Sequence, residues 1–190
     1  MKANLVKISD IDSSIIISLV FKTTNNPLKT KIYPDNADAY LDLNCVLQLK
    51  KIQQLIKEIN PNWRLFIGDA YRPMKYQNML YQLSNNSGTF VAKPDDNSFH
   101  TKGIAVDIGI FDIITNNLIP FPPIEHSEKA HSNFSNSNNE LSSEQINNRE
   151  LLKKLMTENG FECYKFEWWH FNFINHQQYT TLNIDFDKLY

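Results

Sequence analysis

Two side chains that could bind a metal ion, His100 and Asp107, lie on either side of a glycine in the middle of the chain. Asp107 interrupts the run 104–110, whose isoleucines and valine alternate as they do in a buried strand. Its neighbours on the other face are alanine and glycine, which leave room beside the carboxylate. Gly103 can adopt the positive φ that would fold His100 back over the start of this strand. Because an unpaired charge in an apolar strand is costly, the pattern indicates a cation next to Asp107.

A second imidazole comes late in the chain, where His170 follows Glu167 after two tryptophans. Two histidines and one aspartate, with a glutamate that need not bind the metal, are the composition of a catalytic zinc site. Such a site keeps a fourth position for water, and the glutamate serves as the general base. In a straight strand, residues three apart point to opposite faces. We therefore expect Glu167 in the turn before a strand that begins near Trp168.

The elements that must position these residues follow from hydrophobic periodicity and from the usual signals at helix ends. The pattern predicts strands at Ile15–Phe21, Trp63–Ile67, 104–110, Phe161–Phe166 and Trp168–Ile174, and helices at about Asp38–Ile59, at Pro73–Leu83 and between an Asn148 cap and Gly160. A long polar connection at about 112–148 follows the central strand, and the segment 85–97 also has the composition of a loop. This order predicts an α+β domain with a central antiparallel sheet flanked by helices.

Composition limits the class of protein. The chain of 190 residues is 42% hydrophobic, which suits one globular domain over residues 1–190. A formal net charge of −2 gives no reason to expect nucleic acid or an anionic membrane as partner, and no apolar run has the length of a membrane span. No export signal is recognisable, so the cytoplasm is the expected compartment. Cys45 and Cys163 are expected to be buried free thiols rather than a disulfide.

Three blocks of the chain together resemble a known family. They are Gly-Asp-Ala-Tyr-Arg-Pro at 68–73, Ser-Phe-His-Thr-Lys-Gly-Ile-Ala-Val-Asp at 98–107 and Glu-Trp-Trp-His-Phe at 167–171. Their order and internal spacing resemble the signature blocks of the zinc D-alanyl-D-alanine dipeptidases of the VanX type. That family belongs to a larger fold group of D,D-peptidases and Hedgehog-like domains. The resemblance runs over most of the chain and implies this fold and the hydrolysis of a D,D-dipeptide.

The resemblance implies a role for each matching residue. His100, Asp107 and His170 would hold one Zn²⁺ per chain. Glu167 would be the catalytic base, and Arg72 would stabilise the transition state. The physical chemistry fits, because zinc makes a nucleophile available from water at neutral pH. The guanidinium of Arg72 is a permanently charged fork that suits an oxyanion.

Substrate contacts are implied in the same way. Ser98 and Asp69 fall at matching positions and would shape the substrate site or hold its residues in place. Where the family has an aspartate in the loop after the central strand, Glu125 would bind the free amino group of the substrate. The stretch Leu19–Lys22 stands where the family has a tyrosine, so a phenolic hydroxyl is expected to be missing. These departures bear on the identity of the dipeptide, which is the predicted small-molecule partner.

Each of these residues also has a simpler structural explanation. Asp107 could be a buried acid satisfied by backbone donors, and Arg72 could bridge a carboxylate at a turn. Asp69 could orient Arg72 or cap the helix that follows. The pair Trp168–Trp169 is expected in the core. Three further histidines are not assigned to the metal: His126, His131 and His176.

The leading functional hypothesis is a zinc-dependent D-alanyl-D-alanine dipeptidase. One alternative is a D,D-carboxypeptidase or another cell-wall peptidase of the same fold, which would act on longer peptides. Another alternative is a zinc-stabilised binding domain without catalysis. The presence of both Glu167 and Arg72 argues against the binding domain.

Overall fold

The computed structural model of the chain describes residues 1–84, 91–93, 98–124 and 127–189. Within these residues the main sheet has the strand order β2-β4-β5-β8-β7, with β6 paired to the end of β5. The strands are β2 (Ile16–Ile17), β4 (Trp63–Asp69), β5 (Ala105–Asp112), β6 (Asn117–Leu118), β7 (Phe161–Cys163) and β8 (His170–Phe173). A smaller antiparallel sheet pairs β1 (Leu5–Lys7) with β3 (Tyr40–Asp42). The strand β5 is therefore central, with β4 on one side and β8 on the other.

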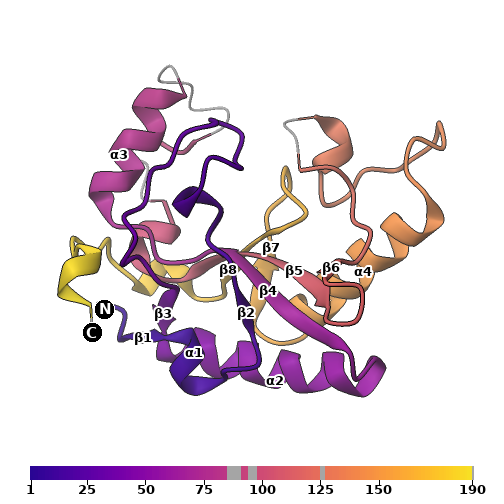
Figure 1. Cartoon of the computed structure of the whole chain (residues 1–190), viewed down its shortest axis with the longest axis horizontal. Helices are drawn as coiled ribbons and strands as arrows, with labels where there is room; N and C mark the ends of the chain where they lie inside the picture. The colour runs from indigo at the N-terminus through magenta and orange to yellow at the C-terminus, as the bar shows by residue number, and fades with distance from the viewer. Residues whose placement is uncertain (85–90, 94–97, 125–126, 190) are drawn as a thin grey trace.

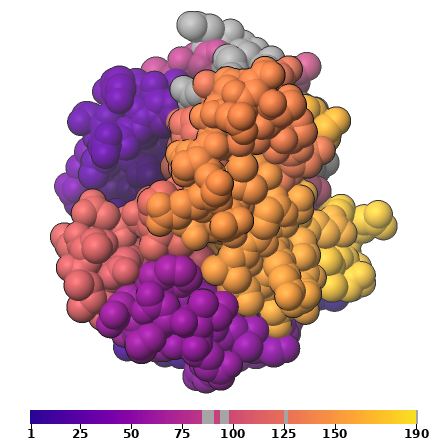
Figure 2. Space-filling model, turned by 90° about the vertical axis from the view of Figure 1, so that its right-hand side faces the viewer, coloured from indigo at the N-terminus to yellow at the C-terminus, as the bar shows by residue number. Residues whose placement is uncertain are grey.

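Helices surround this sheet. They are α1 (Ile8–Ile11), α2 (Leu43–Ile59), α3 (Met74–Leu83) and α4 (Ser143–Thr157). Figure 1 shows α1 and α2 side by side beneath the sheet, with α3 toward one end of the molecule and α4 toward the other. In Figure 2 the purple segment that includes α2 lies below the orange segment that includes α4, and these two helices are in contact. None of the helices among the described residues has both the length and the apolar character needed to cross a bilayer.

The main core forms where α2 places its apolar face against the sheet. Leu49, Ile52 and Ile56 recur at helical spacing and have no exposed surface. Leu65 and Ile67 alternate along β4 and are equally buried in the same cluster. This packing fixes β4, and the pairing of β4 with β5 in turn fixes the strand that carries Asp107.

The α+β class predicted from the sequence is confirmed. The strand predicted at Trp63–Ile67 is β4, the helix predicted to end at Ile59 is α2, and the helix predicted to follow Pro73 is α3. Both cysteines are free thiols, as expected, although Cys45 is buried and Cys163 only half-buried.

Two predictions near the N-terminus are wrong. The strand expected at Ile15–Phe21 is only β2, and a 3-10 turn at Val20–Lys22 follows it. The helix expected from Asp38 begins at Leu43, because the residues before it form β3 and pair with β1. The sheet is not wholly antiparallel, since β2 pairs with β4 in parallel. Alternation shows which face of a strand is buried, but it says nothing of the direction of the partner strand.

The last helix begins earlier than predicted. Its N-cap is Ser142 rather than Asn148, and Ser142 forms a reciprocal capping box with Gln145. Asn148 lies inside the helix and donates from its side chain to the carbonyl of Pro120 at 2.8 Å. Gly160 follows the helix with a φ of 87°, as expected of its terminator. The polar connection after β5 therefore ends at Ser142.

The two closing strands, β7 and β8, are shorter than predicted. The chain turns between them, and β8 begins at His170 rather than near Trp168. Glu167 lies in this turn, as expected. Trp168 and Trp169 are buried, which confirms their place in the core, and the ring of Trp168 stacks on Phe121 with ring centroids 4.4 Å apart.

Candidate active site

The central strand β5 places Asp107 between residues of both neighbouring strands. Asp107 is the register partner of Asp69 on β4 and of His170 at the start of β8. Adjacent strands lie about 4.8 Å apart, so this pairing makes neighbours of residues that are far apart in the sequence. The register of β4 and β5 shifts between Ile67 and Asp69, which marks an irregularity at this end of the pair.

His100 reaches the same point through the turn that precedes β5. It opens the 3-10 turn His100–Lys102, which ends at Gly103 with a φ of 72°. A side chain at Gly103 would also place its Cβ 2.5 Å from Cδ2 of Leu5, so both the conformation and the space favour glycine. The carbonyl of His100 accepts a hydrogen bond from the N–H of Arg72 at 3.1 Å. The prediction that Gly103 folds His100 back over the start of the strand is confirmed.

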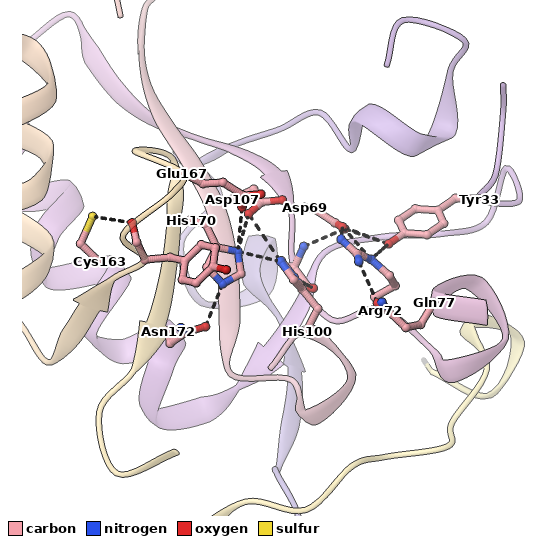
Figure 3. A network of polar contacts seen from close by, with 12 residues as sticks. Tyr33, Asp69, Arg72, Gln77, His100, Asp107, Cys163, Glu167, His170 and Asn172 are labelled. Carbon is pink, nitrogen blue, oxygen red and sulfur yellow. Dashed lines mark hydrogen bonds and ion pairs between the residues drawn. The ribbon is translucent and has the colours of Figure 1, made fainter. Parts of the chain in front are cut away.

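Three donor atoms converge at this end of the sheet (Figure 3). The distance from Oδ1 of Asp107 is 3.4 Å to Nε2 of His100 and 3.0 Å to Nδ1 of His170. The two nitrogens lie 3.2 Å from each other. Ligands held 2.0–2.1 Å from a tetrahedral zinc ion are about 3.3–3.4 Å apart. The spacing of the three donors therefore fits a zinc ion.

Each imidazole has a hydrogen-bond acceptor beside the ring nitrogen that points away from the converging donors. Nδ1 of His100 lies 2.7 Å from the carbonyl oxygen of Ala70, which can only accept, so Nδ1 carries the proton. Nε2 of His170 lies 2.8 Å from Oδ1 of Asn172, another acceptor. When both rings carry their protons on these outer nitrogens, two nitrogen lone pairs and the carboxylate of Asp107 face one point. In that form the lone pairs and the carboxylate repel one another, and a cation among them would relieve the repulsion.

The charges around Asp107 favour its ionised form. Burial alone would raise the pKa of Asp107, but the charges and hydrogen bonds of His100 and His170 outweigh burial and hold this pKa well below its usual range. Burial opposes the charged form of His170, yet the hydrogen bond with Asp107 and its charge raise the pKa of His170 above its usual value. A carboxylate that stays ionised is what a metal ligand requires.

Glu167 approaches this group from the turn between β7 and β8. Its Oε2 lies 3.9 Å from Nδ1 of His170. The turn is held by a hydrogen bond from the N–H of Trp168 to the carbonyl of Ala130 at 2.9 Å. Burial raises the pKa of Glu167, and the charge of Asp107 also raises it, although the cationic groups nearby offset part of the shift. A carboxyl with a raised pKa beside a metal site is typical of a residue that exchanges a proton during catalysis.

Arg72 lies beside the three donors in a buried network of polar side chains (Figure 3). Its Nε and Nη2 both donate to Oδ2 of Asp69, at 3.1 and 2.6 Å, and its Nη1 donates to Oε1 of Gln77 at 2.8 Å. The hydroxyl of Tyr33 accepts from Nε at 3.2 Å and donates to Asp69 at 2.9 Å. Burial alone would lower the pKa of Arg72, but the charge of Asp69, the groups of Tyr33 and Asp107 and the hydrogen bond to Asp69 together outweigh burial and raise this pKa. The guanidinium is therefore always charged.

The guanidinium of Arg72 keeps two donors for a ligand. A guanidinium has five N–H groups. The N–H of Nε is shared by Asp69 and Tyr33, one N–H of Nη2 binds Asp69, and one N–H of Nη1 binds Gln77. Among the described residues, the second N–H of Nη1 and that of Nη2 have no such partner. N–H groups of a guanidinium suit a carboxylate or an oxyanion. The ring of Phe21 covers the guanidinium, with its centroid 5.4 Å from Cζ.

Comparison with known proteins assigns the family. Residues 1–188 match the family model described as D-ala-D-ala dipeptidase. The chain belongs to this family of peptidases. The D-alanyl-D-alanine dipeptidase of Escherichia coli (strain K12) is 30% identical over 148 residues, which are 75% of this chain and 74% of that protein. The D-alanyl-D-alanine dipeptidase of Enterococcus faecium is 25% identical over 148 residues, 64% of this chain and 67% of that protein.

Two solved structures are similar at lower sequence identity. VanYB in complex with D-alanine-D-alanine gives a TM-score of 0.45 at 15% identity and covers 76% of this chain and 77% of that chain. The LD-carboxypeptidase LdcB gives a TM-score of 0.45 at 13% identity and covers 73% of this chain. The matched part is 61% of the LdcB chain, less than two thirds of its length. The assignment to the dipeptidase family depends on the sequence match.

Most of the residues predicted from the sequence lie together in this family member. The structure groups His100, Asp107, His170, Glu167, Arg72 and Asp69. Ser98 lies just before the turn, and its carbonyl accepts from the N–H and the hydroxyl of Thr101 at 3.0 and 2.6 Å. Asp69 has no exposed surface and also accepts from the N–H of Ala70 at 2.9 Å, so its contacts are those of a residue that orients Arg72. Glu125 lies outside the described residues.

Sequence reasoning missed three polar residues of this dipeptidase-family site: Tyr33, Gln77 and Asn172. A phenolic hydroxyl, expected to be missing at Leu19–Lys22, is present next to Arg72 because Tyr33 supplies one. The sequence could have indicated Asn172. It follows His170, a candidate metal ligand, by two positions, and residues two apart on a strand share a face. The contacts of Tyr33 and Gln77 are tertiary, and no local pattern marks them.

Proposed function

We propose that this protein is a zinc-dependent dipeptidase that hydrolyses D-alanyl-D-alanine, or a close D,D-dipeptide, to free amino acids. One observation carries the proposal: the donor atoms of His100, Asp107 and His170 lie 3.0–3.4 Å apart, with Glu167 and Arg72 beside them. Membership of the family supports peptidase activity. The names of the two curated relatives support this choice of substrate.

In the proposed mechanism the three converging side chains hold one Zn²⁺ per chain. When bound, zinc supplies the Lewis acidity that lowers the pKa of a water molecule to about 7. Glu167 accepts the proton of the water that attacks the peptide carbonyl, and it later delivers that proton to the leaving amine. Arg72 donates its two remaining N–H groups to the oxyanion that develops on this carbonyl.

The other predicted residues have supporting roles in this proposal. Asp69 holds the guanidinium of Arg72, and Ser98 braces the turn that carries His100. Glu125 binds the free amino group of the dipeptide, a role that follows from the sequence resemblance. Residues 1–190 would act as one zinc dipeptidase domain, and the location in the cytoplasm stays a prediction.

The zinc-loaded chain is expected to hydrolyse D-alanyl-D-alanine with a higher kcat/KM than an N-acylated peptide that ends in D-alanyl-D-alanine. A dipeptidase recognises the free amino group of its substrate, which the acyl group removes. The measurement is release of D-alanine from both peptides, with L-alanyl-L-alanine as the stereochemical control. A preference for the blocked peptide would contradict the dipeptidase and indicate a D,D-carboxypeptidase. No turnover of any dipeptide with zinc bound would indicate a non-catalytic binding domain.

Replacing Gln77 by leucine is expected to lower kcat for the dipeptide by about tenfold or more. Gln77 has no exposed surface, accepts from Nη1 of Arg72 at 2.8 Å and donates to the carbonyl of Ala92 at 2.7 Å. A hydrogen bond to a charged group is worth about 1.5–3 kcal/mol, and without it the guanidinium loses its fixed position. Gln77→Glu keeps an acceptor for Arg72 and should retain more activity than Gln77→Leu.

Gln53→Leu is the matched control for the Gln77 variants. Gln53 is also fully buried, but its side chain binds the backbone of Trp63 and Leu65, at the far end of β4 from Asp69. Gln53→Leu should lower the free energy of unfolding and leave kcat near the native value. An equal fall in kcat for both leucine variants would contradict a specific role for Gln77.

A further inference from the structure

Asn172 is a polar residue in contact with His170 to which the proposed mechanism gives no role. It follows His170 by two positions on β8, so both side chains leave the same face of the strand. Its Oδ1 lies 2.8 Å from Nε2 of His170 (Figure 3). Asn172 is only 7% exposed, and its register partners Ala105 and Glu162 on the two neighbouring strands hold its backbone in place. Its side chain is therefore fixed against one ring nitrogen.

The ring of His170 has a choice between two neutral forms. With the proton on Nδ1, the ring would donate to Oδ1 of Asp107, which lies 3.0 Å away. That form would put a hydrogen on the nitrogen that faces the other two donors and would block its lone pair. With the proton on Nε2, the ring donates to Oδ1 of Asn172 and Nδ1 is open. The carboxylate of Asp107 thus favours the blocked form and the amide oxygen of Asn172 favours the open form.

We propose that Asn172 is a positioning residue that selects the form of His170 able to bind zinc through Nδ1. The inference rests on the proposed function, because it concerns the ion that the three donors would hold. His100 has the equivalent help from the backbone, since its Nδ1 donates to the carbonyl of Ala70. Partners on the far side of metal-binding histidines generally fix the ring and its protonation, and their loss lowers metal affinity about 10–100-fold.

An asparagine is well suited to this position. Its oxygen accepts the Nε2 proton, while its side chain adds no charge to a site that already contains Asp107 and Glu167. Of the other side chains around His170, Tyr164 meets it with a ring edge, at a centroid distance of 5.5 Å, and the ring of His100 is edge-on at 4.9 Å. Nε2 thus lies against Asn172, whereas Nδ1 faces Asp107, Glu167 and His100.

Zinc affinity of the full-length chain tests this role without reference to turnover. Asn172→Leu has nearly the same shape and no acceptor, and we expect its zinc dissociation constant, measured by competition with a chromophoric chelator, to rise about 10–100-fold. Asn172→Asp keeps the acceptor and should bind zinc at least as tightly as the native chain. Asn159→Leu is the control, since Asn159 is 6% exposed and donates to the carbonyl of Leu155 in α4, away from the site. Its zinc affinity should be native.

Nitrogen-15 NMR of the histidine rings gives a second readout. In the zinc form of the native chain, His170 should show metal on Nδ1 and a proton on Nε2. Native zinc affinity in Asn172→Leu, or zinc bound through Nε2 in the native chain, would overturn the proposal. If Asn172→Leu does not fold, Asn172→Asp still tests it, because a tenfold loss of affinity with the acceptor retained would also overturn it.

These outcomes separate the role of Asn172 from the proposed function. A native chain that binds zinc but hydrolyses no dipeptide would contradict the dipeptidase, and the affinities of the Asn172 variants would still show whether Asn172 acts on His170. A native chain that binds no zinc would contradict both. Tight binding of zinc by the native and Asn159→Leu chains, with weak binding by Asn172→Leu, would support the role of Asn172 whatever the substrate is.

Discussion

Glu167→Gln is expected to lower kcat for D-alanyl-D-alanine by about 10²–10⁴-fold while the chain keeps its zinc. The amide has nearly the shape of the carboxyl group but cannot accept a proton from water. Oε2 of Glu167 lies 3.9 Å from Nδ1 of His170, outside the group of three converging donors, so its loss should leave zinc binding intact. Release of D-alanine gives kcat, and metal analysis of the same sample gives the zinc content.

Glu162 provides the matched control for this substitution. Its carboxyl group on β7 is 56% exposed and lies 3.8 Å from Nδ1 of His176, which is not one of the three donors. Glu162→Gln should therefore have native kcat and native zinc content. If Glu167→Gln kept more than a tenth of the native kcat, Glu167 would not be the general base. If the variant lost its zinc, Glu167 would be a metal ligand instead.

The convergence of His100, Asp107 and His170 could be predicted from the sequence because these residues stand out from those around them. Asp107 is a carboxylate in an apolar run, and the cost of burying a lone charge indicates a cation at that position. Gly103 predicted that the chain turns after His100, because glycine can adopt a positive φ. The φ of Gly103 is 72°. The spacing of Glu167 and His170 placed one before the strand and the other on it. Each of these inferences depends on local chemistry and local geometry.

Strand pairing could not be predicted in the same way. The neighbours of Asp107 on β4 and β8 depend on which strands pair and in which register, and hydrophobic alternation leaves both open. The parallel pairing of β2 with β4 was missed for this reason. The early start of α4 is different, because the capping box of Ser142 and Gln145 is visible in the sequence. The first turn of α4 has no apolar periodicity, so the sequence predicts a loop up to Asn148.

Residues that orient other side chains were the hardest to predict. Tyr33 and Gln77 both bind the guanidinium of Arg72, but Tyr33 comes from a segment far from Arg72 in the sequence and Gln77 from the helix after it. The type of such a residue follows from the partner that it must satisfy, and that partner is known only once the fold is known. A buried guanidinium needs several acceptors, so the sequence predicts that acceptors exist without saying which residues supply them.

Removal of zinc with a chelator is expected to abolish hydrolysis and to lower the Tm, and addition of zinc should restore both. The donor atoms of the two imidazoles and of Asp107 lie 3.0–3.4 Å apart. Removing zinc removes the attraction between the ion and these three donors. Zinc present at a thousand times its dissociation constant adds about 4 kcal/mol to the free energy of unfolding. For a chain of this size each kcal/mol shifts Tm by about 2–4 °C, so the expected change is roughly 8–16 °C.

The difference in Tm between the zinc form and the metal-free form should widen as pH rises. In the metal-free chain the pKa of His170 is raised above 6.5, so protonation of His170 stabilises the fold. That contribution is complete below the unfolded-state pKa and is lost as pH rises through the folded-state pKa. Protons also compete with zinc for Nδ1 of His170, so stabilisation by zinc grows over the same range. Both effects have the same sign.

Thermal unfolding between about pH 5 and pH 8, with and without zinc, measures this difference. Asp107→Ala is the control, because it lacks one donor and the charge that raises the pKa of His170. Its Tm should respond weakly to zinc at every pH. A native chain whose Tm did not rise with zinc, or rose equally at every pH, would show that the imidazole of His170 does not bind the ion. The convergence of the three side chains would then be a hydrogen-bonded cluster of the fold rather than a metal centre.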